Sequence, residues 1–222
     1  MMHLLRKLSQ PFIWRLYKWY LSSPKWYNYK GIEVRLLPTV FHPGWLVSTQ
    51  TLLRFLSGWD LNGKSVLELG AGSGLISLYA SNQGALTTAT DINPLAIQAM
   101  KESAQKNNLK LSIIESDLFE KIGVQHFDLI IINPPYFPKD PVDYWEKAFY
   151  CGSNFEYFHK LFDQIKPYCS ESTKTIMILN EHCNIEAILA IASKYALTIN
   201  LLDSPKISRE KQYIFEIYKK TN

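Results

Sequence analysis

The feature that most constrains the fold is a glycine-rich turn between an apolar strand and a helix. A short buried strand is predicted over 65–69, three glycines follow within 70–74, and a helix is expected over 75–82. Glycine lets the backbone turn sharply and approach a ligand closely, and the N-terminus of a helix offers free N–H groups and a positive dipole. This order predicts a nucleotide-type βαβ unit, and therefore an α/β fold with parallel strands.

The rest of the chain continues the alternation of strands and helices. Further strands are expected over 86–90, 110–115, 127–132, 175–179, 197–202 and 212–218, and further helices over 94–107, 153–166 and 185–195. The connection 203–211 contains Pro205 and no helical pattern, so the last two strands are expected to pair antiparallel. We therefore predict a Rossmann-like sheet of seven strands, mostly parallel with one antiparallel strand, and helices on both faces.

Residues 1–30 differ from the rest of the chain in charge. They contain six of the 24 basic residues and none of the 20 acidic ones, which leaves a net charge of −2 on residues 31–222. Apolar residues recur at helical spacing over 3–21, and 22–30 is rich in turn formers. We predict a basic, aromatic arm with a short helix at 1–30 and one α/β domain at 31–222. Such an arm can pack on its own domain, follow a phosphate backbone or lie on a membrane surface.

The segment between the arm and the glycine turn carries weaker signals. Apolar and polar residues alternate over 32–37, which predicts a half-buried strand. The irregular loop 40–45 contains His42, which fits either the wall of a substrate pocket or a packed loop. Ser48 or Thr49 is the expected N-cap of a helix that ends near residue 57.

Cysteine usage and hydropathy exclude several classes of protein. Cys151, Cys169 and Cys183 are odd in number and widely spaced, which disfavours a disulfide framework or a zinc site and fits a reducing cytoplasm. No apolar run approaches the ~18 residues that a membrane span needs. Basic residues interrupt the apolar ones near the N-terminus, unlike a secretory signal. We expect a cytoplasmic protein with no stable membrane insertion and no metal site.

Polar side chains lie at the ends of the predicted strands. Glu68 lies in the first strand, Asp91 follows the second, Asp117 follows the third, and the sequence Asn-Pro-Pro-Tyr at 133–136 follows the fourth. Proline cannot continue a central strand because it lacks the N–H donor, so the fourth strand ends abruptly. Open α/β sheets bind ligands outside the carboxyl ends of their strands. We therefore predict one site formed by these residues.

The glycine turn alone is compatible with NAD, FAD, a phosphate or S-adenosylmethionine. The dinucleotide fingerprint G-x-G-x-x-G would place its third glycine at Leu75, whereas this chain has it at Gly74. Asp91, which lies 23 residues after Glu68, is placed to accept hydrogen bonds from ribose hydroxyls. A ligand that contains a nucleoside is therefore predicted, and a nucleotide-binding oxidoreductase of Rossmann type stays open as an alternative.

Four motifs in this order resemble those of class I S-adenosylmethionine-dependent methyltransferases. They are Val66–Gly74, Thr90–Asn93, Ser116–Leu118 and Ile132–Tyr136. The Asn-Pro-Pro-Tyr element is similar to that of HemK/PrmC-like and other "methyltransferase small" enzymes, which methylate nitrogen conjugated to a π-system. The resemblance covers about residues 40–220 and implies an N-methyltransferase with S-adenosyl-L-methionine as its cofactor. An inactive methyltransferase-like subunit would carry the same motifs.

The resemblance also implies roles for individual residues. The residues expected to bind the cofactor are Glu68, Gly70, Gly72, Gly74, Asp91, Ile92, Asp117, Leu118 and Asn133. Asp91 is expected to take the ribose hydroxyls, Ile92 to pack on the adenine and Asp117 to bond the adenine amino group. The residues expected to act in catalysis are Asn133, Pro134 and Tyr136.

The chemistry of a planar nitrogen gives an independent reason for the catalytic assignment. The lone pair of such a nitrogen is delocalised into a carbonyl or ring, which makes it a poor nucleophile. The side-chain oxygen of Asn133 and the carbonyl of Pro134 can bind its hydrogens out of the plane and so free the lone pair, while Tyr136 can stack on the flat group. We expect a macromolecular acceptor: an adenine of RNA or DNA, slightly favoured by the basic arm, or a glutamine of a protein.

Overall fold

The computed structural model describes residues 20, 22–207 and 210–220. Its central sheet has the strand order β5-β4-β3-β6-β7-β10-β8. The strands are β3 (Ser65–Leu69), β4 (Leu86–Asp91), β5 (Leu111–Glu115), β6 (Leu129–Ile132), β7 (Lys174–Asn180), β8 (Leu197–Asp203) and β10 (Glu210–Lys219). β10 runs antiparallel to both of its neighbours, and β3 to β7 pair in parallel. The predicted seven-stranded sheet with one antiparallel strand is confirmed; the short strand β9 (Lys206–Ile207), which pairs with β10, is an addition.

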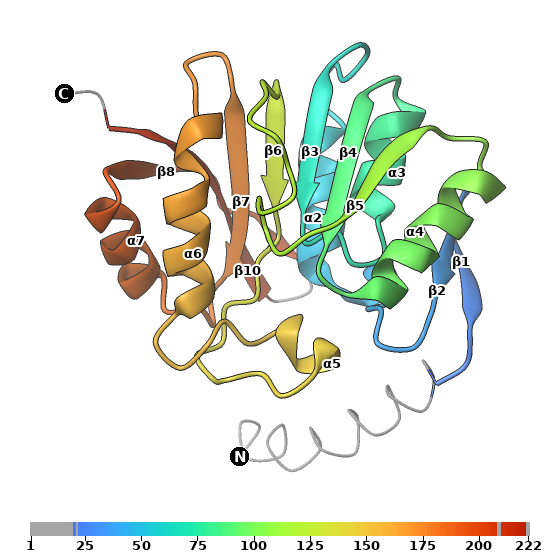
Figure 1. Cartoon of the computed structure of the whole chain (residues 1–222), viewed down its shortest axis with the longest axis horizontal. Coiled ribbons are helices and arrows are strands. Elements are labelled where there is room, and N and C mark those ends of the chain that lie inside the picture. The colour runs from blue at the N-terminus through green and yellow to red at the C-terminus, as the bar shows by residue number, and fades with distance from the viewer. Residues whose placement is uncertain (1–19, 21, 208–209, 221–222) are drawn as a thin grey trace.

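Helices cover both faces of the sheet. The helices are α2 (Val47–Leu56), α3 (Leu75–Asn82), α4 (Pro94–Lys106), α5 (Tyr144–Lys147), α6 (Glu156–Gln164) and α7 (Ile185–Lys194), with short 3-10 turns η1 (Pro43–Trp45) and η2 (Lys166–Tyr168). Figure 1 shows α6 and α7 in front of the sheet and α2 behind it. The helices predicted over the core of the domain are thus confirmed, with small shifts at their ends. No helix in the described part of the chain is long and apolar enough to cross a membrane.

The residues of β6 show why both faces need cover. Successive side chains of a strand point to opposite faces of the sheet. Ile130 and Ile132 pack in the cluster that includes α6 and α7, whereas Leu129 and Ile131 pack in the cluster that includes α2 and α3. All four side chains are buried. A strand buried on both faces needs a continuous apolar run, which is the pattern of a central parallel strand.

The strand order reverses between β3 and β6. β4 and β5 lie on one side of β3, and the chain then crosses to β6 on its other side. Leu69 and Ile132 are paired at the carboxyl ends of these two strands, so the glycine turn and the Asn133–Tyr136 turn begin side by side. Ligands of open α/β sheets bind at such a switch point, and both sequence motifs lie there.

The segment before the sheet differs from its predicted form. The turn-rich linker expected over 22–30 contains a strand, β1 (Lys25–Tyr29), which pairs antiparallel with β2 (Ile32–Leu36). Lys30 and Gly31 connect the two strands with φ of 49° and 90°, as a tight two-residue hairpin turn requires. The linker prediction was wrong here because the aromatic residues of this stretch favour a strand. The strand predicted over 32–37 is confirmed as β2.

Two further expectations concern the N-terminal part of the chain. Helix α2 begins after Leu46, which has no side-chain cap bond, so the predicted capping by Ser48 or Thr49 was wrong. Those two residues lie inside the first turn of the helix instead. The helix predicted over 3–21 lies outside the described residues except for Tyr20. The division into an arm at 1–30 and a domain at 31–222 stays a prediction. The β1–β2 hairpin pairs residues on both sides of the predicted boundary between residues 30 and 31.

Candidate active site

A cavity of about 520 Å³ opens at the carboxyl ends of the central strands. This volume lies within the range of about 300–1,000 Å³ found for small-molecule sites. The predicted site residues that line the cavity are Glu68, Gly70, Gly72, Asp91, Ile92, Asp117, Leu118, Asn133, Pro134 and Tyr136. The fold therefore brings together residues that lie at, or just after, the carboxyl ends of β3, β4, β5 and β6. Gly74 is the predicted site residue that does not line the cavity.

Two glycines leave open space in the cavity wall. Gly70 and Gly72 have φ of +65° and +55°, and a Cβ built on either meets no heavy atom within 4 Å. A side chain at either position would be strained in this left-handed backbone and would project into that space. The N–H of Ala71 donates to the carbonyl of Thr90 at 2.8 Å, which ties the turn to β4. The turn thus presents bare backbone to a ligand.

Gly74 has a packing role in the structure. It is the N-cap of α3, with φ +73°. A Cβ at Gly74 would lie 2.4 Å from Cγ of Met100, which is buried in α4. The third glycine of the motif therefore allows α3 and α4 to pack closely together.

Asp91 joins the end of β4 to the glycine turn. Its Oδ2 accepts a hydrogen bond from the N–H of Gly72 at 2.7 Å, and its Oδ1 accepts one from the N–H of Asn93 at 2.8 Å. Burial raises the pKa of this carboxyl, and the backbone donors oppose the rise. A carboxylate oxygen accepts more than one hydrogen bond. Asp91 can therefore also receive a pair of ligand hydroxyls without leaving its place.

Glu68 is buried beneath the same turn. Its Oε2 accepts hydrogen bonds from the N–H of Ser77, at 2.8 Å, and from the Ser77 hydroxyl. Burial is the main cause that raises the pKa of Glu68 to about 7, against the effect of these bonds. Ser77 lies in the first turn of α3, so Glu68 anchors the helix that follows the glycine turn.

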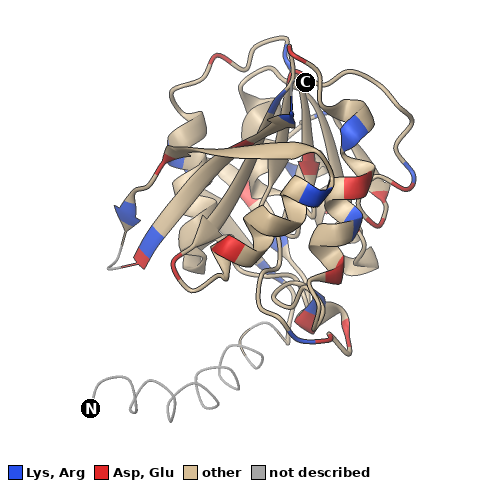
Figure 2. Cartoon of the chain, turned by 90° about the vertical axis from the view of Figure 1, so that its left-hand side faces the viewer, with Lys and Arg blue, Asp and Glu red and all other residues tan. Residues whose placement is uncertain are grey.

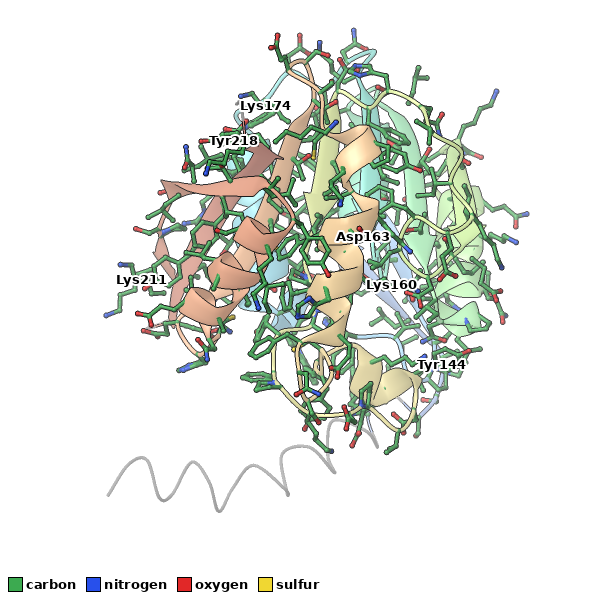
Figure 3. The ribbon with its side chains drawn as sticks, turned by 60° about the vertical axis from the view of Figure 1, so that its left-hand side comes forward. Tyr144, Lys160, Asp163, Lys174, Lys211 and Tyr218 are labelled. Carbon is green, nitrogen blue, oxygen red and sulfur yellow. The ribbon has the colours of Figure 1, made fainter. Side chains whose placement is uncertain are left out.

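Asp117 forms an ion pair across the cavity wall. The Nζ of Lys160 lies 2.5 Å from Oδ2 of Asp117 and 2.5 Å from Oε1 of Glu120. Figure 3 shows Lys160 on α6, on the same side of that helix as Tyr144 of α5. Because these side chains are partly exposed, the pair contributes at most about 1 kcal/mol to stability. Its main effect is to hold the carboxylate at the wall, and no sequence motif points to Lys160.

The turn after β6 is held at its backbone and at its ring. The N–H groups of Tyr136 and Phe137 donate to the carbonyl of Phe149 at 3.1 and 3.0 Å. Asn180 Nδ2 donates to the Tyr136 hydroxyl at 2.7 Å. Burial raises the pKa of Tyr136, so its phenol stays neutral at physiological pH. The turn is thus held at two separate points, the backbone of Tyr136 and Phe137 and the hydroxyl of Tyr136.

The segment 137–152 folds back over this turn and forms a further wall of the cavity. Phe137 and Tyr150 form a β-bridge at its base. Lys139 and Glu146 form an ion pair at 2.9 Å nearer its tip. Asp140, Tyr144 and Tyr150 of this segment are among the residues that line the cavity.

His42 is packed inside its loop. It is 6% exposed, its Nδ1 accepts a hydrogen bond from the N–H of Gly44 at 3.1 Å, and its ring stacks on Trp45 with centroids 4.9 Å apart. Its neighbours Phe41 and Pro43 line the cavity, whereas His42 does not. Of the two hypotheses for this residue, the structure favours the packed loop.

Comparison with known proteins gives a matching family model and curated relatives that are named as methyltransferases. Residues 31–194 match the family model described as "Methyltransferase small domain". A protein assigned as a protein glutamine methyltransferase in Methanocaldococcus jannaschii is 41% identical over 110 residues, which are 49% of this chain and 53% of that protein. The chain spans about half or less of the length of the first curated relatives that it matches.

Two solved structures share the fold. The Mtq2–Trm112 complex of E. cuniculi, described as responsible for methylation of the eRF1 translation termination factor, matches with a TM-score of 0.62 and 22% identity over 82% of this chain and 99% of that one. A 16S rRNA methyltransferase of T. thermophilus, in complex with AdoMet and guanosine, matches with a TM-score of 0.64 and 18% identity over 89% of this chain and 50% of that one. The family resemblance read from the four motifs is confirmed by the family model, which spans most of the chain: this protein belongs to the methyltransferase small domain family.

Proposed function

We propose that this protein is an S-adenosylmethionine-dependent methyltransferase that acts on a planar amide or exocyclic amino nitrogen. The observation that supports this most directly is that one cavity is lined both by Gly70, Gly72 and Asp91 and by Asn133 and Tyr136. The first group suits a nucleoside, and the second suits a planar nitrogen. Because both groups of residues lie at the β3–β6 switch point, the two ligands would lie close enough for a methyl group to pass from one to the other.

The residues around the glycine turn fit the proposed cofactor. A Cβ at Gly70 or Gly72 would stand in open space beside the turn, so bare backbone can lie against the methionine part. Asp91 offers both oxygens to ribose hydroxyls, and Asp117 offers an acceptor to the adenine amino group, with Ile92 and Leu118 as apolar neighbours. Glu68 supports the turn through α3. The bound cofactor would supply an electrophilic methyl group on its sulfonium sulfur.

The residues of the turn after β6 have the chemistry to activate the acceptor. The side-chain oxygen of Asn133 and the carbonyl of Pro134 accept hydrogen bonds from the two amino hydrogens. Contacts that strengthen as the nitrogen becomes tetrahedral stabilise the transition state more than the ground state. The methylated nitrogen is positively charged and acidic, so it loses its proton to solvent after the transfer. No base is needed for this step, which agrees with the raised pKa of Tyr136, whose phenol stays protonated. Positioning supplies much of the remaining rate enhancement.

The test is to incubate the protein with methyl-labelled S-adenosylmethionine and a cell extract, and then to treat the product with nuclease or protease. We expect macromolecular label that one of the two treatments removes. Binding of NADH without binding of S-adenosyl-L-homocysteine would instead support the oxidoreductase alternative. Binding of S-adenosyl-L-homocysteine with no labelled product from any extract would indicate an inactive subunit.

We infer a macromolecular acceptor, and the charge of residues 1–30 slightly favours RNA or DNA over protein. Figure 2 shows Lys and Arg interspersed with Asp and Glu on the side of the described residues that faces the viewer, so the support for nucleic acid comes from the arm. The similarity to a protein assigned as a glutamine methyltransferase supports protein as the second candidate.

A truncation tests the arm. Deletion of residues 1–19 removes four of its six basic residues and leaves strand β1 intact. If the arm binds nucleic acid, the truncated protein should lose salt-sensitive RNA binding. Unchanged RNA binding, or label that only protease removes from the products of the full chain, would count against a nucleic-acid acceptor.

A further inference from the structure

A chain of hydrogen bonds runs from the C-terminal strand to Tyr136. Asn180 Nδ2 donates to the Tyr136 hydroxyl at 2.7 Å and to Oε1 of Glu210 at 2.8 Å. Gln212 Nε2 donates to the same oxygen of Glu210 at 3.0 Å. Asn180 ends β7, and the antiparallel register of β10 sets Gln212 opposite Asn180. The pairing of β7 with β10 therefore places this chain behind the cavity wall.

The side-chain amide of Asn180 has one satisfactory orientation. Its Oδ1 accepts hydrogen bonds from the N–H of His182 at 2.9 Å and from the thiol of Cys183 at 3.5 Å. Together with the two bonds from Nδ2, these use all four hydrogen-bonding positions of the amide. The reverse orientation would set its NH₂ group against the His182 N–H and its oxygen against the Glu210 carboxylate. Asn180 is only 5% exposed, so water cannot easily replace the lost bonds.

This orientation has a consequence for Tyr136. Because Asn180 Nδ2 can only donate, the Tyr136 oxygen is the acceptor in their hydrogen bond. The backbone N–H of Tyr136 is held separately by the carbonyl of Phe149, at 3.1 Å. One bond holds the residue at its backbone and the other holds it at the far end of its ring, and between these two points the residue lines the cavity. The position and direction of the ring axis are therefore fixed at both ends.

We propose that Asn180 is the positioning residue of the acceptor site. It fixes the position of the Tyr136 ring, on which the planar acceptor group stacks, and Glu210 holds Asn180 in turn. This inference rests on the proposed methyltransferase function. The competing role is structural only: Asn180 would close the turn after β7 through its Oδ1 bonds, and its bond to Tyr136 would have no effect on the reaction.

A double-mutant cycle with Asn180→Ala and Tyr136→Phe separates the two roles. For each variant, kcat and KM of methyl transfer and the Kd of S-adenosyl-L-homocysteine are measured. We expect each single variant to lower kcat, on the order of 10-fold and up to about 10²-fold, with the Kd unchanged. We expect the double variant to be no worse than Asn180→Ala, because both changes remove the same bond. Glu210→Ala should lower kcat less, since the bond between Asn180 and Tyr136 remains.

Asn184→Ala is the matched control. Asn184 lies four residues further along the chain, caps α7 by accepting a hydrogen bond from the N–H of Ala187 at 3.1 Å, and has no bond to Tyr136. The control loses a structural asparagine bond of the same kind and should keep the wild-type kcat. Melting temperatures of all variants show whether any loss of activity reflects unfolding.

Three results would overturn the positioning role. The first is a wild-type kcat in Asn180→Ala. The second is a loss of kcat in the double variant that equals the product of the two single losses, and the third is a loss of S-adenosyl-L-homocysteine affinity equal to the loss of kcat. If Asn180→Ala does not fold, Tyr136→Phe decides the question alone, because it removes a single oxygen atom: a wild-type kcat there refutes the proposal. A wild-type protein that neither binds S-adenosyl-L-homocysteine nor transfers a methyl group refutes the methyltransferase function itself.

Discussion

The N–H of Gly72 and Oδ2 of Asp91 are joined by a 2.7 Å hydrogen bond that crosses from the glycine turn to the end of β4. β3 and β4 pair in parallel with Leu69 opposite Thr90, so the residues that follow the two strands lie next to each other. The bond fixes the carboxylate relative to the bare backbone of the turn. A site held in this way loses little conformational freedom when a ligand binds.

Asp91→Ala should abolish tight cofactor binding. The change removes both proposed hydrogen-bond acceptors for the ribose hydroxyls and also releases the N–H of Gly72. Because hydrogen bonds to a charged group contribute roughly 1.5–3 kcal/mol each, we expect the Kd of S-adenosyl-L-homocysteine to rise at least about 10²-fold, measured by isothermal titration calorimetry. Asp60→Ala is the control, since Asp60 accepts a bond from Asn62 in an exposed turn; a comparable loss of affinity there would argue against a specific role for Asp91.

Asn133→Ala should separate catalysis from cofactor binding. The variant loses the side-chain oxygen that we propose accepts a hydrogen bond from the substrate nitrogen. Removal of one such transition-state contact typically costs on the order of 10²-fold in kcat. The Kd of S-adenosyl-L-homocysteine should stay close to that of the wild type. Asn133→Asp keeps an oxygen acceptor and should lose less activity than Asn133→Ala. Equal losses of activity and cofactor affinity would contradict the assigned role.

Gly74→Ala should destabilise the fold more than Gly63→Ala does. Both glycines have similar φ, +73° and +69°, but a Cβ at Gly74 would lie 2.4 Å from Cγ of Met100, whereas one at Gly63 meets nothing within 4 Å. The left-handed backbone costs each variant about 1–2 kcal/mol, and overpacking against α4 adds about 1–3 kcal/mol at Gly74 only. Urea unfolding measures the difference, and equal free energies of unfolding for the two variants would count against close packing at Gly74.

The ionisation of Glu68 should make stability depend on pH. Its pKa is about 7 in the folded protein against an ordinary 4.5. Between these values the folded state keeps the proton and the unfolded state loses it, so the free energy of unfolding falls as pH rises from about 4.5 to about 7, by on the order of 3 kcal/mol. Glu68→Gln, which can still accept from Ser77, should lack this component. Urea unfolding of both proteins at pH 4.5 and pH 7.5 tests the expectation; parallel pH profiles would refute it.

Local patterns predicted most of the elements of the domain. The apolar run 129–132 predicted a central strand, and that strand is buried on both faces. Pro94 predicted the start of α4, and Asn93 caps that helix by accepting a hydrogen bond from the N–H of Leu95. These signals succeed because strand burial, capping and turn chemistry depend on residues close together in the sequence.

Other features depended on packing and were predicted poorly. Residues 25–29 form a strand because pairing with β2 adds to the strand preference of their aromatic residues. Helix α2 begins without a side-chain cap at Leu46, since burial of Leu52, Leu53 and Leu56 in the core stabilises the helix. At α2, burial in the core therefore outweighs the local capping preference.

The amino-acid sequence by itself determined the class of fold, the family and the part of the cavity lining that lies at the strand ends, because residues at the ends of parallel strands must meet at one edge of the sheet. Only the tertiary structure decided which distant side chains orient those residues. Lys160 reaches Asp117 from 43 residues away, and Asn180 reaches Tyr136 from 44 residues away. Such bonds depend on the register of strands and the packing of helices, which bring groups to within about 3 Å, and no local pattern encodes that distance.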